Sequence, residues 1–318
     1  MIVQSILLIT GLALILWGAN WLVDGSSSIA RKTGLSEFVI GLTIVGIGTS
    51  TPEMVVSFIS AFQGKSDMAV GNIVGSNIFN VLMILGITTL ISPLMITKEN
   101  MKRDIPTNIG VTLLLFLLGM KNTLFGIGSD SISRWEGAAM LILFAIYLYK
   151  TFKSGNSEED AQEETKTYGT GMSLLMIGAG LLALIGGGRL FVNSATVIAQ
   201  QLHLSEKFIA ITIMSAGTSL PELATCIVAA RKGRGQMALG NIIGSNISNI
   251  LLILGGSALI HPLSFSGISE IDMTTLTLSA IVLLVSTFTF KKKYLDRTEG
   301  AILLIMEILY MVWLFINA

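Results

Sequence analysis

The sequence predicts an all-α integral membrane protein with ten transmembrane helices in two inverted five-helix repeats. Of its 318 residues, 52% are hydrophobic and 13% are charged, and the mean hydropathy is +0.76. Soluble domains carry about 25% charged residues, so this composition indicates a membrane protein. The other two observations are an internal duplication and the presence of five apolar segments in each copy. Because five is odd, the second copy enters the membrane in the opposite orientation.

Two pairs of motifs carry the duplication. GIGTSTPE at 46–53 returns as SAGTSLPE at 215–222, and GNIVGSNIFN at 71–80 returns as GNIIGSNISN at 240–249. Both pairs keep one spacing, since 222 minus 53 and 240 minus 71 each give 169. Each copy places a glutamate in apolar surroundings, where a carboxylate is costly and is usually functional.

Apolar segments long enough for helices follow one another along the chain, separated by short polar turns. They fall at 3–23, 38–62, 68–92, 105–120, 135–150, 172–200, 208–230, 237–260, 273–290 and 299–316. We divide the chain into a first repeat at 1–153, an acidic linker at 154–170 and a second repeat at 171–318. The first segment lacks a positively charged start, so we interpret it as a transmembrane helix and not as a signal peptide.

The charges of the loops predict the orientation. Fifteen of the 20 Lys and Arg residues fall in loops on one side of the membrane, and four fall on the other, namely Lys65, Lys121, Arg134 and Lys207. Positive residues accumulate in cytoplasmic loops. We therefore expect a multi-pass protein of the plasma membrane with a cytoplasmic linker and both termini extracellular.

Charge and cysteine content exclude several classes. Lys and Arg together number 20, as do Asp and Glu, and this balance argues against a protein that binds nucleic acid. Cys226 is the single cysteine of the sequence. An intrachain disulfide framework and a metal site built from several thiolates are therefore excluded.

The first GTSxPE motif predicts a broken helix that exposes oxygen atoms. Pro52 removes a backbone donor and frees a carbonyl in the preceding turn. Irregular backbone at membrane depth is tolerated only where it lines a cavity. The side chains of Thr49, Ser50 and Glu53 project at this break. The second copy supplies the same chemistry through Thr218, Ser219, Pro221 and Glu222.

The GNxxGSN motifs add a stripe of polar side chains. Asn72, Ser76 and Asn80 are four residues apart, so they share one helix face, and Asn241, Ser245 and Asn249 repeat the pattern. Carboxylates, hydroxyls and amides without imidazole or thiolate suit Ca²⁺ or Na⁺ and not zinc or copper. Two ionised glutamates hold two negative charges, which one Ca²⁺ ion neutralises.

A structural role for the two glutamates is the alternative. Ser50-x-x-Glu53 and Ser219-x-x-Glu222 have the spacing of a capping box, with proline in the first helical turn. In that case each glutamate would cap a helix and bind no ion.

At these motifs the chain resembles the calcium/cation antiporter superfamily, especially prokaryotic sodium/calcium exchangers. The resemblance covers essentially the whole chain and implies ion sites between the second, third, seventh and eighth helices. It implies that Glu53 and Glu222 are the central Ca²⁺ ligands, shared with Na⁺. The further implied ligands are Thr49, Thr218, Ser50, Ser219, Ser76, Ser245, Asn80, Asn249 and the carbonyls of Gly46 and Ser215. Positions expected to support them or to break the helices are Pro52, Pro221, Asn72, Asn241, Asn77 and Asn246.

The resemblance implies a secondary transporter, not an enzyme, that exchanges Na⁺ for Ca²⁺ by alternating access. The first and sixth helices would be the moving gate, and more than two Na⁺ per Ca²⁺ would make exchange electrogenic. Asn249 stands where some relatives carry aspartate, which disfavours K⁺ cotransport. The expected partners are the lipid bilayer and the ions Na⁺ and Ca²⁺, with no cofactor and no protein partner.

Two alternatives stay open on the sequence alone. An H⁺/Ca²⁺ antiporter would use the same framework with protons on the two glutamates, and a cation channel would use them as a selectivity ring. The residues also leave Arg189 and Glu307 without an assigned role.

Overall fold

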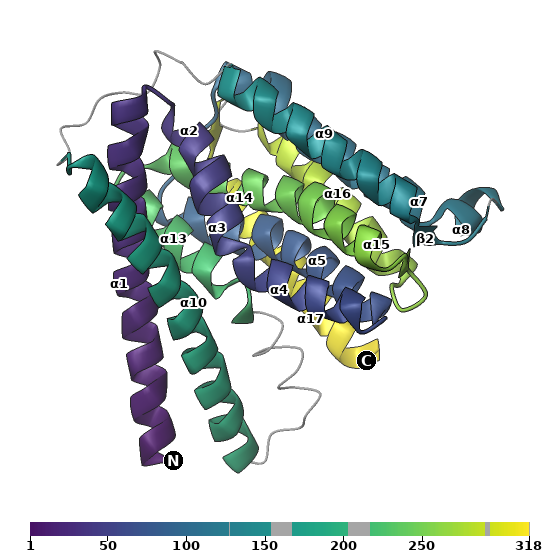
Figure 1. The fold of residues 1–318 in the computed structure, drawn as a ribbon, viewed down its shortest axis with the longest axis horizontal. Helices are drawn as coiled ribbons and strands as arrows, with labels where there is room; N and C mark the ends of the chain where they lie inside the picture. The colour runs from purple at the N-terminus through teal and green to yellow at the C-terminus, as the bar shows by residue number, and fades with distance from the viewer. Residues whose placement is uncertain (127, 154–166, 203–216, 290–292, 318) are drawn as a thin grey trace.

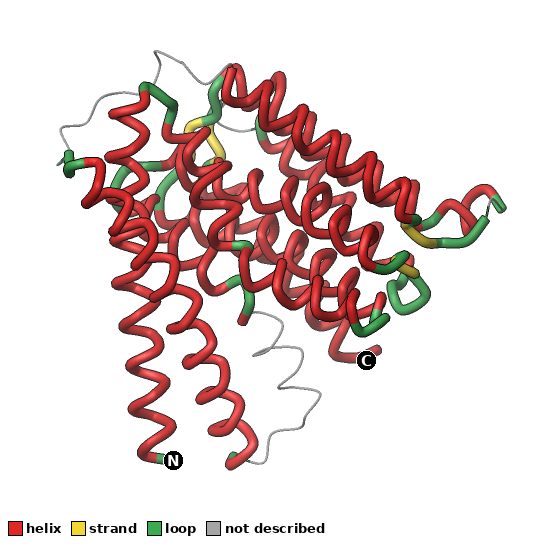
Figure 2. Tube along the Cα trace, viewed as in Figure 1, coloured by secondary structure: helices red, strands yellow, loops and turns green. Residues whose placement is uncertain are grey.

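The computed structural model describes residues 1–126, 128–153, 167–202, 217–289 and 293–317. Almost all regular structure in these ranges is helical, and the strands are limited to two-residue pairs (Figure 2). The prediction of an all-α protein is confirmed for this part of the chain. The acidic cluster of the predicted linker lies in 154–166, outside the described residues, and helix α10 begins at Thr170, inside the predicted linker range.

The first half contains one long helix followed by several that change between α and π geometry. In order they are α1 (Ile2–Thr33), α2 (Glu37–Ile40), η1 (Gly41–Val45), α3 (Gly46–Thr49), α4 (Thr51–Phe62), α5 (Ser66–Phe79), η2 (Asn80–Ile84), α6 (Leu85–Ile91), η3 (Asn100–Asp104), α7 (Ile105–Gly119), α8 (Lys121–Phe125) and α9 (Arg134–Lys153). The segments written η are π-helices. Gly34 ends α1 with a φ of 69°, a left-handed conformation that glycine adopts without strain.

The described part of the second half repeats this order. It consists of α10 (Thr170–Gln201), α13 (Leu220–Arg231), α14 (Gly235–Ser248), η5 (Asn249–Leu254), α15 (Gly255–Ile260), α16 (Glu270–Ser286) and α17 (Arg297–Asn317). The π segments η2 and η5 begin at Asn80 and Asn249, which are 169 residues apart. The structural repeat therefore follows the sequence repeat at these motifs.

Two short strand pairs join the halves. β1 (Leu94–Met95) pairs antiparallel with β4 (Tyr294–Leu295), and β2 (Ser131–Ile132) pairs antiparallel with β3 (Leu263–Ser264). In each pair a strand from one half meets a strand from the other. The pairs therefore tie the loops of the two halves together.

The long helices are apolar enough to cross a membrane. Within the described residues five helices meet this condition by length and composition, at Ile2–Thr33, Ser66–Ile91, Thr170–Gln201, Gly235–Ile260 and Arg297–Ile316. A sixth span is formed if Glu37–Thr49 and Thr51–Phe62, which meet at a 48° bend, are counted together. Helices α7 and α16 have 15 and 17 residues, fewer than the roughly 20 that a bilayer requires. The count of ten spans stays a prediction.

Helices α1 and α10 lie side by side and run in opposite directions (Figure 1). Glycines bring their backbones together: a Cβ on Gly18 would lie 2.7 Å from the carbonyl oxygen of Gly180, and one on Gly11 would lie 2.8 Å from that of Gly187. The rising numbers of α1 meet falling numbers of α10, as an antiparallel contact requires. Small residues of this kind allow close helix approach in membranes.

The last helix of each half packs in an equivalent way but with another spacing. A Cβ on Gly137 of α9 would lie 2.7 Å from the carbonyl oxygen of Gly255, and one on Gly300 of α17 would lie 2.9 Å from that of Gly86. Gly86 and Gly255 are 169 residues apart, whereas Gly137 and Gly300 are 163 apart. The difference arises because the connection before α9, which contains α8 and β2, is longer than the one before α17.

An ion pair joins α1 to the turn between α13 and α14. Lys232 Nζ lies 2.7 Å from Asp24 Oδ1, and Arg234 pairs with Glu37 beside it. Asp24 therefore has a salt-bridge partner at the end of the molecule where Lys and Arg are concentrated.

Candidate ion-binding site

The predicted break after Thr49 is present. Helix α3 ends there, Ser50 has φ −76° and ψ 8°, and α4 begins at Thr51 with Pro52 in its first turn. The hydroxyl of Thr51 donates to the carbonyl oxygen of Gly48 at 2.7 Å. The second copy begins in the same way, since Ser219 has φ −90° and ψ 7° and Pro221 lies in the first turn of α13.

The two serines at the breaks bond across the repeat. Ser50 Oγ donates to Glu222 Oε1 at 3.1 Å, and Ser219 Oγ donates to Glu53 Oε1 at 3.3 Å. Neither serine makes a side-chain bond to the helix that follows it. The capping-box alternative is therefore wrong at both positions, because each hydroxyl serves the glutamate of the opposite half.

Both carboxylates are enclosed by protein. Glu53 and Glu222 are each 1% exposed, and one oxygen of each, Oε2, has no hydrogen-bond partner among the described residues. Burying an ionised carboxylate without compensation costs several kcal/mol. Each half thus presents one buried acidic oxygen that requires a positive charge.

The asparagines of the two halves form a reciprocal network. Asn80 Nδ2 donates to Asn246 Oδ1 at 3.0 Å, and Asn249 Nδ2 donates to Asn77 Oδ1 at 2.9 Å. Asn77 Nδ2 also donates to the carbonyl oxygen of Asn246 at 3.2 Å. These bonds use the amide nitrogens, so the side chains of Asn80 and Asn249 point their oxygens away from this network.

The oxygens left over define the chemistry of the site. Oδ1 of Asn80 and Oδ1 of Asn249 are buried and have no hydrogen-bond partner in the described chain, as is true of the two Oε2 atoms. Buried polar groups are normally satisfied. The four acceptors lie on α4, η2, α13 and η5. Helix α4 packs against η5, and the equivalent helix α13 packs against η2. A set of acceptors without donors is suited to a cation with oxygen ligands.

A second group of predicted residues holds α3 against α14. Thr49 Oγ1 donates to Asn241 Oδ1 at 3.2 Å, and Ser245 Oγ donates to the carbonyl oxygen of Gly46 at 3.2 Å. A Cβ on Gly46 would lie 3.1 Å from the carbonyl oxygen of Asn241, so the two backbones approach closely there. In this structure Gly46 O and Asn241 Oδ1 are occupied by protein donors.

The remaining predicted residues have supporting or undescribed positions. Asn72 Nδ2 donates to Glu53 O at 3.2 Å and to Ser57 Oγ at 3.0 Å, and its counterpart Asn241 donates to Cys226 Sγ at 3.3 Å. Of the other predicted ligands, Ser76 is buried and Thr218 is half-buried in the turn before α13. Ser215 lies outside the described residues.

The part of the chain that the structure describes holds no richer cluster of metal-binding side chains than this site. Among the described residues no group of three or more His, Cys, Asp or Glu side chains comes together. The site therefore combines two carboxylates with neutral oxygens, and one divalent ion balances its formal charge.

Sequence reasoning missed two features of the site. It did not predict the π segments that begin at Asn80 and Asn249, and it did not predict that the serines reach across the repeat. The first has no signature in the residue pattern. The second could have been suspected from the duplication, because equivalent motifs of inverted halves meet at the centre.

Adding a third carboxylate tests whether Asn249 is a ligand. We expect Asn249→Asp to tighten Ca²⁺ binding by about tenfold, equivalent to about 1.4 kcal/mol, because its free oxygen would become charged. Isothermal titration of the detergent-solubilised protein with Ca²⁺ measures this. Asn241→Asp is the matched control, since Asn241 Oδ1 accepts from Thr49. Equal Ca²⁺ affinity in wild type and Asn249→Asp would contradict the assignment.

Comparisons with known proteins agree with this geometry. Residues 3–153 and 172–316 match the sodium/calcium exchanger protein family. Putative antiporter CaxA of Alkalimonas amylolytica is 38% identical over 330 residues, covering 99% of each chain. Sodium/calcium exchanger MaX1 of Methanosarcina acetivorans is 33% identical over 347 residues, covering 98% of this chain and 99% of that one.

A solved structure is similar over nearly the whole length. It is that of the sodium-calcium exchanger NCX_Mj soaked with Na⁺ and Ca²⁺, which superposes with a TM-score of 0.84 at 32% identity and covers 98% of both chains. The resemblance predicted from the motifs is thereby confirmed, and with it a multi-pass membrane transporter of the cation/Ca²⁺ antiporter type. The chain belongs to the sodium/calcium exchanger protein family.

Proposed function

We propose that this protein exchanges Na⁺ for Ca²⁺ across a cell membrane by alternating access. The observation that supports this most directly is a set of four buried acceptors that have no hydrogen-bond partner among the described residues: Glu53 Oε2, Glu222 Oε2, Asn80 Oδ1 and Asn249 Oδ1. They come in two pairs related by the repeat, so one ion at the centre is shared by both halves. NCX_Mj and MaX1 are both named as sodium/calcium exchangers.

The charge of the site supports electrogenic exchange. Glu53 and Glu222 hold two negative charges when ionised, and one Ca²⁺ ion or two Na⁺ ions neutralise them. The further hydroxyl and carbonyl oxygens at Thr49, Ser50, Thr218 and Ser219 offer places for a third Na⁺. Three Na⁺ for one Ca²⁺ moves one net charge per cycle.

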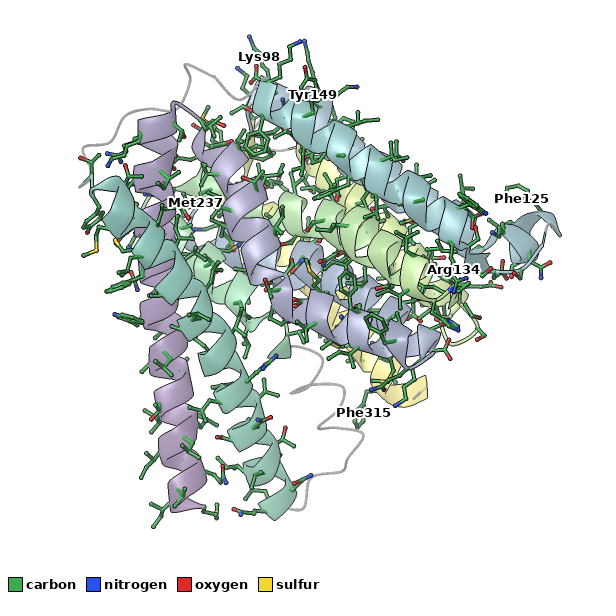
Figure 3. The ribbon with its side chains drawn as sticks, viewed as in Figure 1. Lys98, Phe125, Arg134, Tyr149, Met237 and Phe315 are labelled. Atoms are coloured by element: carbon green, nitrogen blue, oxygen red, sulfur yellow. The ribbon has the colours of Figure 1, made fainter. Side chains whose placement is uncertain are left out.

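The arrangement of the helices supports ten spans in two inverted halves. The equivalent helices α1 and α10 run antiparallel. The hydrogen bond from Ser50 to Glu222 and the one from Ser219 to Glu53 are also equivalent by the repeat. Lys98 and Tyr149 lie near one end of the bundle and Arg134 and Phe125 near the other (Figure 3). The excess of Lys and Arg at the first end favours a cytoplasmic location for it and extracellular termini.

The proposed cycle assigns a role to each part. The core that carries the ligands is formed by α3 with α4, α5 with η2, α13, and α14 with η5. Ser76, Ser245, Gly46 and Ser215 supply further Na⁺ ligands. The glycine-lined pair α1 and α10 is the gate that slides over this core. Binding of ions neutralises the glutamates and permits the occluded state, because crossing with two bare carboxylates is costly.

Flux measurements in proteoliposomes test the coupling ion. We expect an outward Na⁺ gradient at equal pH on both sides to drive uptake of ⁴⁵Ca²⁺, and a pH gradient without Na⁺ to drive none. Uptake driven only by the pH gradient would replace the proposal with H⁺/Ca²⁺ antiport. Ca²⁺ flux that needs no counter-ion would identify a channel.

Imposed membrane potential tests the stoichiometry. With K⁺ and valinomycin setting the potential, we expect a positive interior to accelerate Na⁺-driven Ca²⁺ uptake, because net positive charge then leaves the vesicle. Uptake that is indifferent to potential would indicate electroneutral exchange of two Na⁺ for one Ca²⁺.

A further inference from the structure

Helix α17 buries a carboxyl group that the central site does not use. Glu307 is 1% exposed, and its Oε2 atom has no hydrogen-bond partner among the described residues. It lies on the face of α17 that also carries Leu303, which is fully buried, and Leu304, which packs against Gly86. This face is turned to the protein and not to lipid.

Within the described part of the chain, the helices that pack most extensively on α17 provide no positive charge for this carboxyl. Helix α17 contacts α6, η2 and α16, and neither α6 nor η2 contains a titratable residue. Helix α16 contributes Glu270 and Asp272, which are both acidic. On α17 itself the nearest basic residue is Arg297, ten positions away. Its guanidinium donates to the carbonyl oxygen of Leu90.

The same surroundings offer few oxygens to a metal ion. The hydroxyls of Thr88 and Thr89 on α6 donate to carbonyl oxygens one turn earlier in their own helix. Leucine side chains fill the rest of the face described above. Sodium bound by protein needs several oxygen ligands, as hard cations do, and a proton needs only the carboxylate itself.

The repeat shows that the fold does not require an acid at this position. The last helices of the two halves correspond with a spacing of 163, so the counterpart of Glu307 is Phe144, which is also buried. An apolar ring therefore fills the equivalent position in the first half. A carboxyl at this depth in the membrane is costly and is a functional-site candidate by default.

A polar path approaches the group from the start of α16. Tyr310 lies one turn after Glu307 on α17, and its hydroxyl donates to Asp272 Oδ1 at 2.7 Å. Asp272 lies in the first turn of α16. This hydrogen bond links the start of α16 to the turn of α17 that follows Glu307.

From this geometry we propose that Glu307 is a proton-binding site separate from the central ion site. Uptake of H⁺ forms an O–H bond on the carboxylate and gives a neutral carboxylic acid, with Asp272 and Tyr310 as the route. The neutral acid allows α17 to pack on α6 and η2, and loss of the proton disrupts that packing. The proposal rests on the packing of α17 and holds whichever ion drives Ca²⁺ transport.

Infrared difference spectroscopy tests the site without transport. Spectra of the full protein in lipid, saturated with Ca²⁺, are recorded at neutral and at alkaline pH. We expect a carbonyl band of a buried carboxylic acid that disappears as pH rises in wild type and is absent from Glu307→Gln. Glu99→Gln, which changes an exposed acid, is the control and should keep the band. A wild-type protein without the band, or a Glu307→Gln protein with it, overturns the proposal.

Two further measurements test whether Glu307 binds H⁺ or Na⁺ and whether its protonation affects Ca²⁺ exchange. Raising Na⁺ at constant pH should leave the band unchanged, and its loss would identify Na⁺ as the ligand and overturn proton binding. Ca²⁺ exchange by wild type should fall roughly tenfold on alkalinisation, an effect of about 1.4 kcal/mol, and Glu307→Gln should abolish this fall. Deprotonation of Glu53 and Glu222 favours cation binding, so an equal fall in both proteins contradicts a role for Glu307.

Discussion

Replacing either central glutamate by glutamine is expected to abolish Ca²⁺ exchange. Glu53→Gln or Glu222→Gln removes one of the two negative charges while keeping the volume and an oxygen that can accept from Ser219 or Ser50. Loss of one partner from a buried charge interaction costs about 3–5 kcal/mol, a factor of roughly 100 or more in affinity. Na⁺-driven ⁴⁵Ca²⁺ uptake into proteoliposomes measures the effect.

The control variant for this prediction replaces a glutamate that forms an ion pair away from the central site. Glu136→Gln loses the ion pair that Lys121 makes with Glu136 at 2.8 Å, at the start of α9, and should retain exchange. Size-exclusion profiles and thermal unfolding should show that all three variants fold. Substantial exchange by either central variant would remove the shared Ca²⁺ site from the proposed mechanism.

The second large effect is expected at the contact between α1 and α10. Gly180→Leu should reduce exchange to below about a tenth of wild type, because any Cβ there would lie 2.8 Å from the carbonyl oxygen of Gly18. The two helices would have to separate, and the gate that moves over the core as one pair would be disrupted. The measurement is Na⁺-driven Ca²⁺ uptake at matched protein density.

The same helix provides a closely matched control. Gly178 is exposed, and a Cβ added to it meets no atom within 4 Å, so Gly178→Leu should exchange at nearly the wild-type rate. The two variants carry the same substitution, glycine to leucine, at positions two residues apart. Equal exchange by both would indicate that the close contact of α1 and α10 is not needed for gating.

The sequence predicts much of this site because the repeat is strict where the ligands lie. Glu53 and Glu222, and Asn80 and Asn249, keep the 169 spacing, and inverted halves bring equivalent positions together at the centre. Each of these four residues has a buried side-chain oxygen without a hydrogen-bond partner among the described residues. Their chemistry could be anticipated from residue type alone, since hard oxygen ligands suit only some cations.

Other features depend on three-dimensional contacts that no local pattern encodes. Ser50 has the spacing of a capping residue for α4 and yet donates to Glu222, because the opposite half brings a carboxylate closer than the helix end. The change of spacing from 169 to 163 reflects loop length, and it hides the correspondence of Glu307 with Phe144 until α9 and α17 are superposed by their glycines.

The ion pair between Asp24 and Lys232 bears on which side of the membrane the empty protein faces. If the two halves were identical, states open to opposite sides would have equal free energy, since exchanging the halves converts one state into the other. A preference can therefore arise only at unequal positions. The counterparts of Asp24 and Lys232 are Asn193 and Gln63, which carry no charge. A bias of about 1.4 kcal/mol from this one difference populates the two states ten to one.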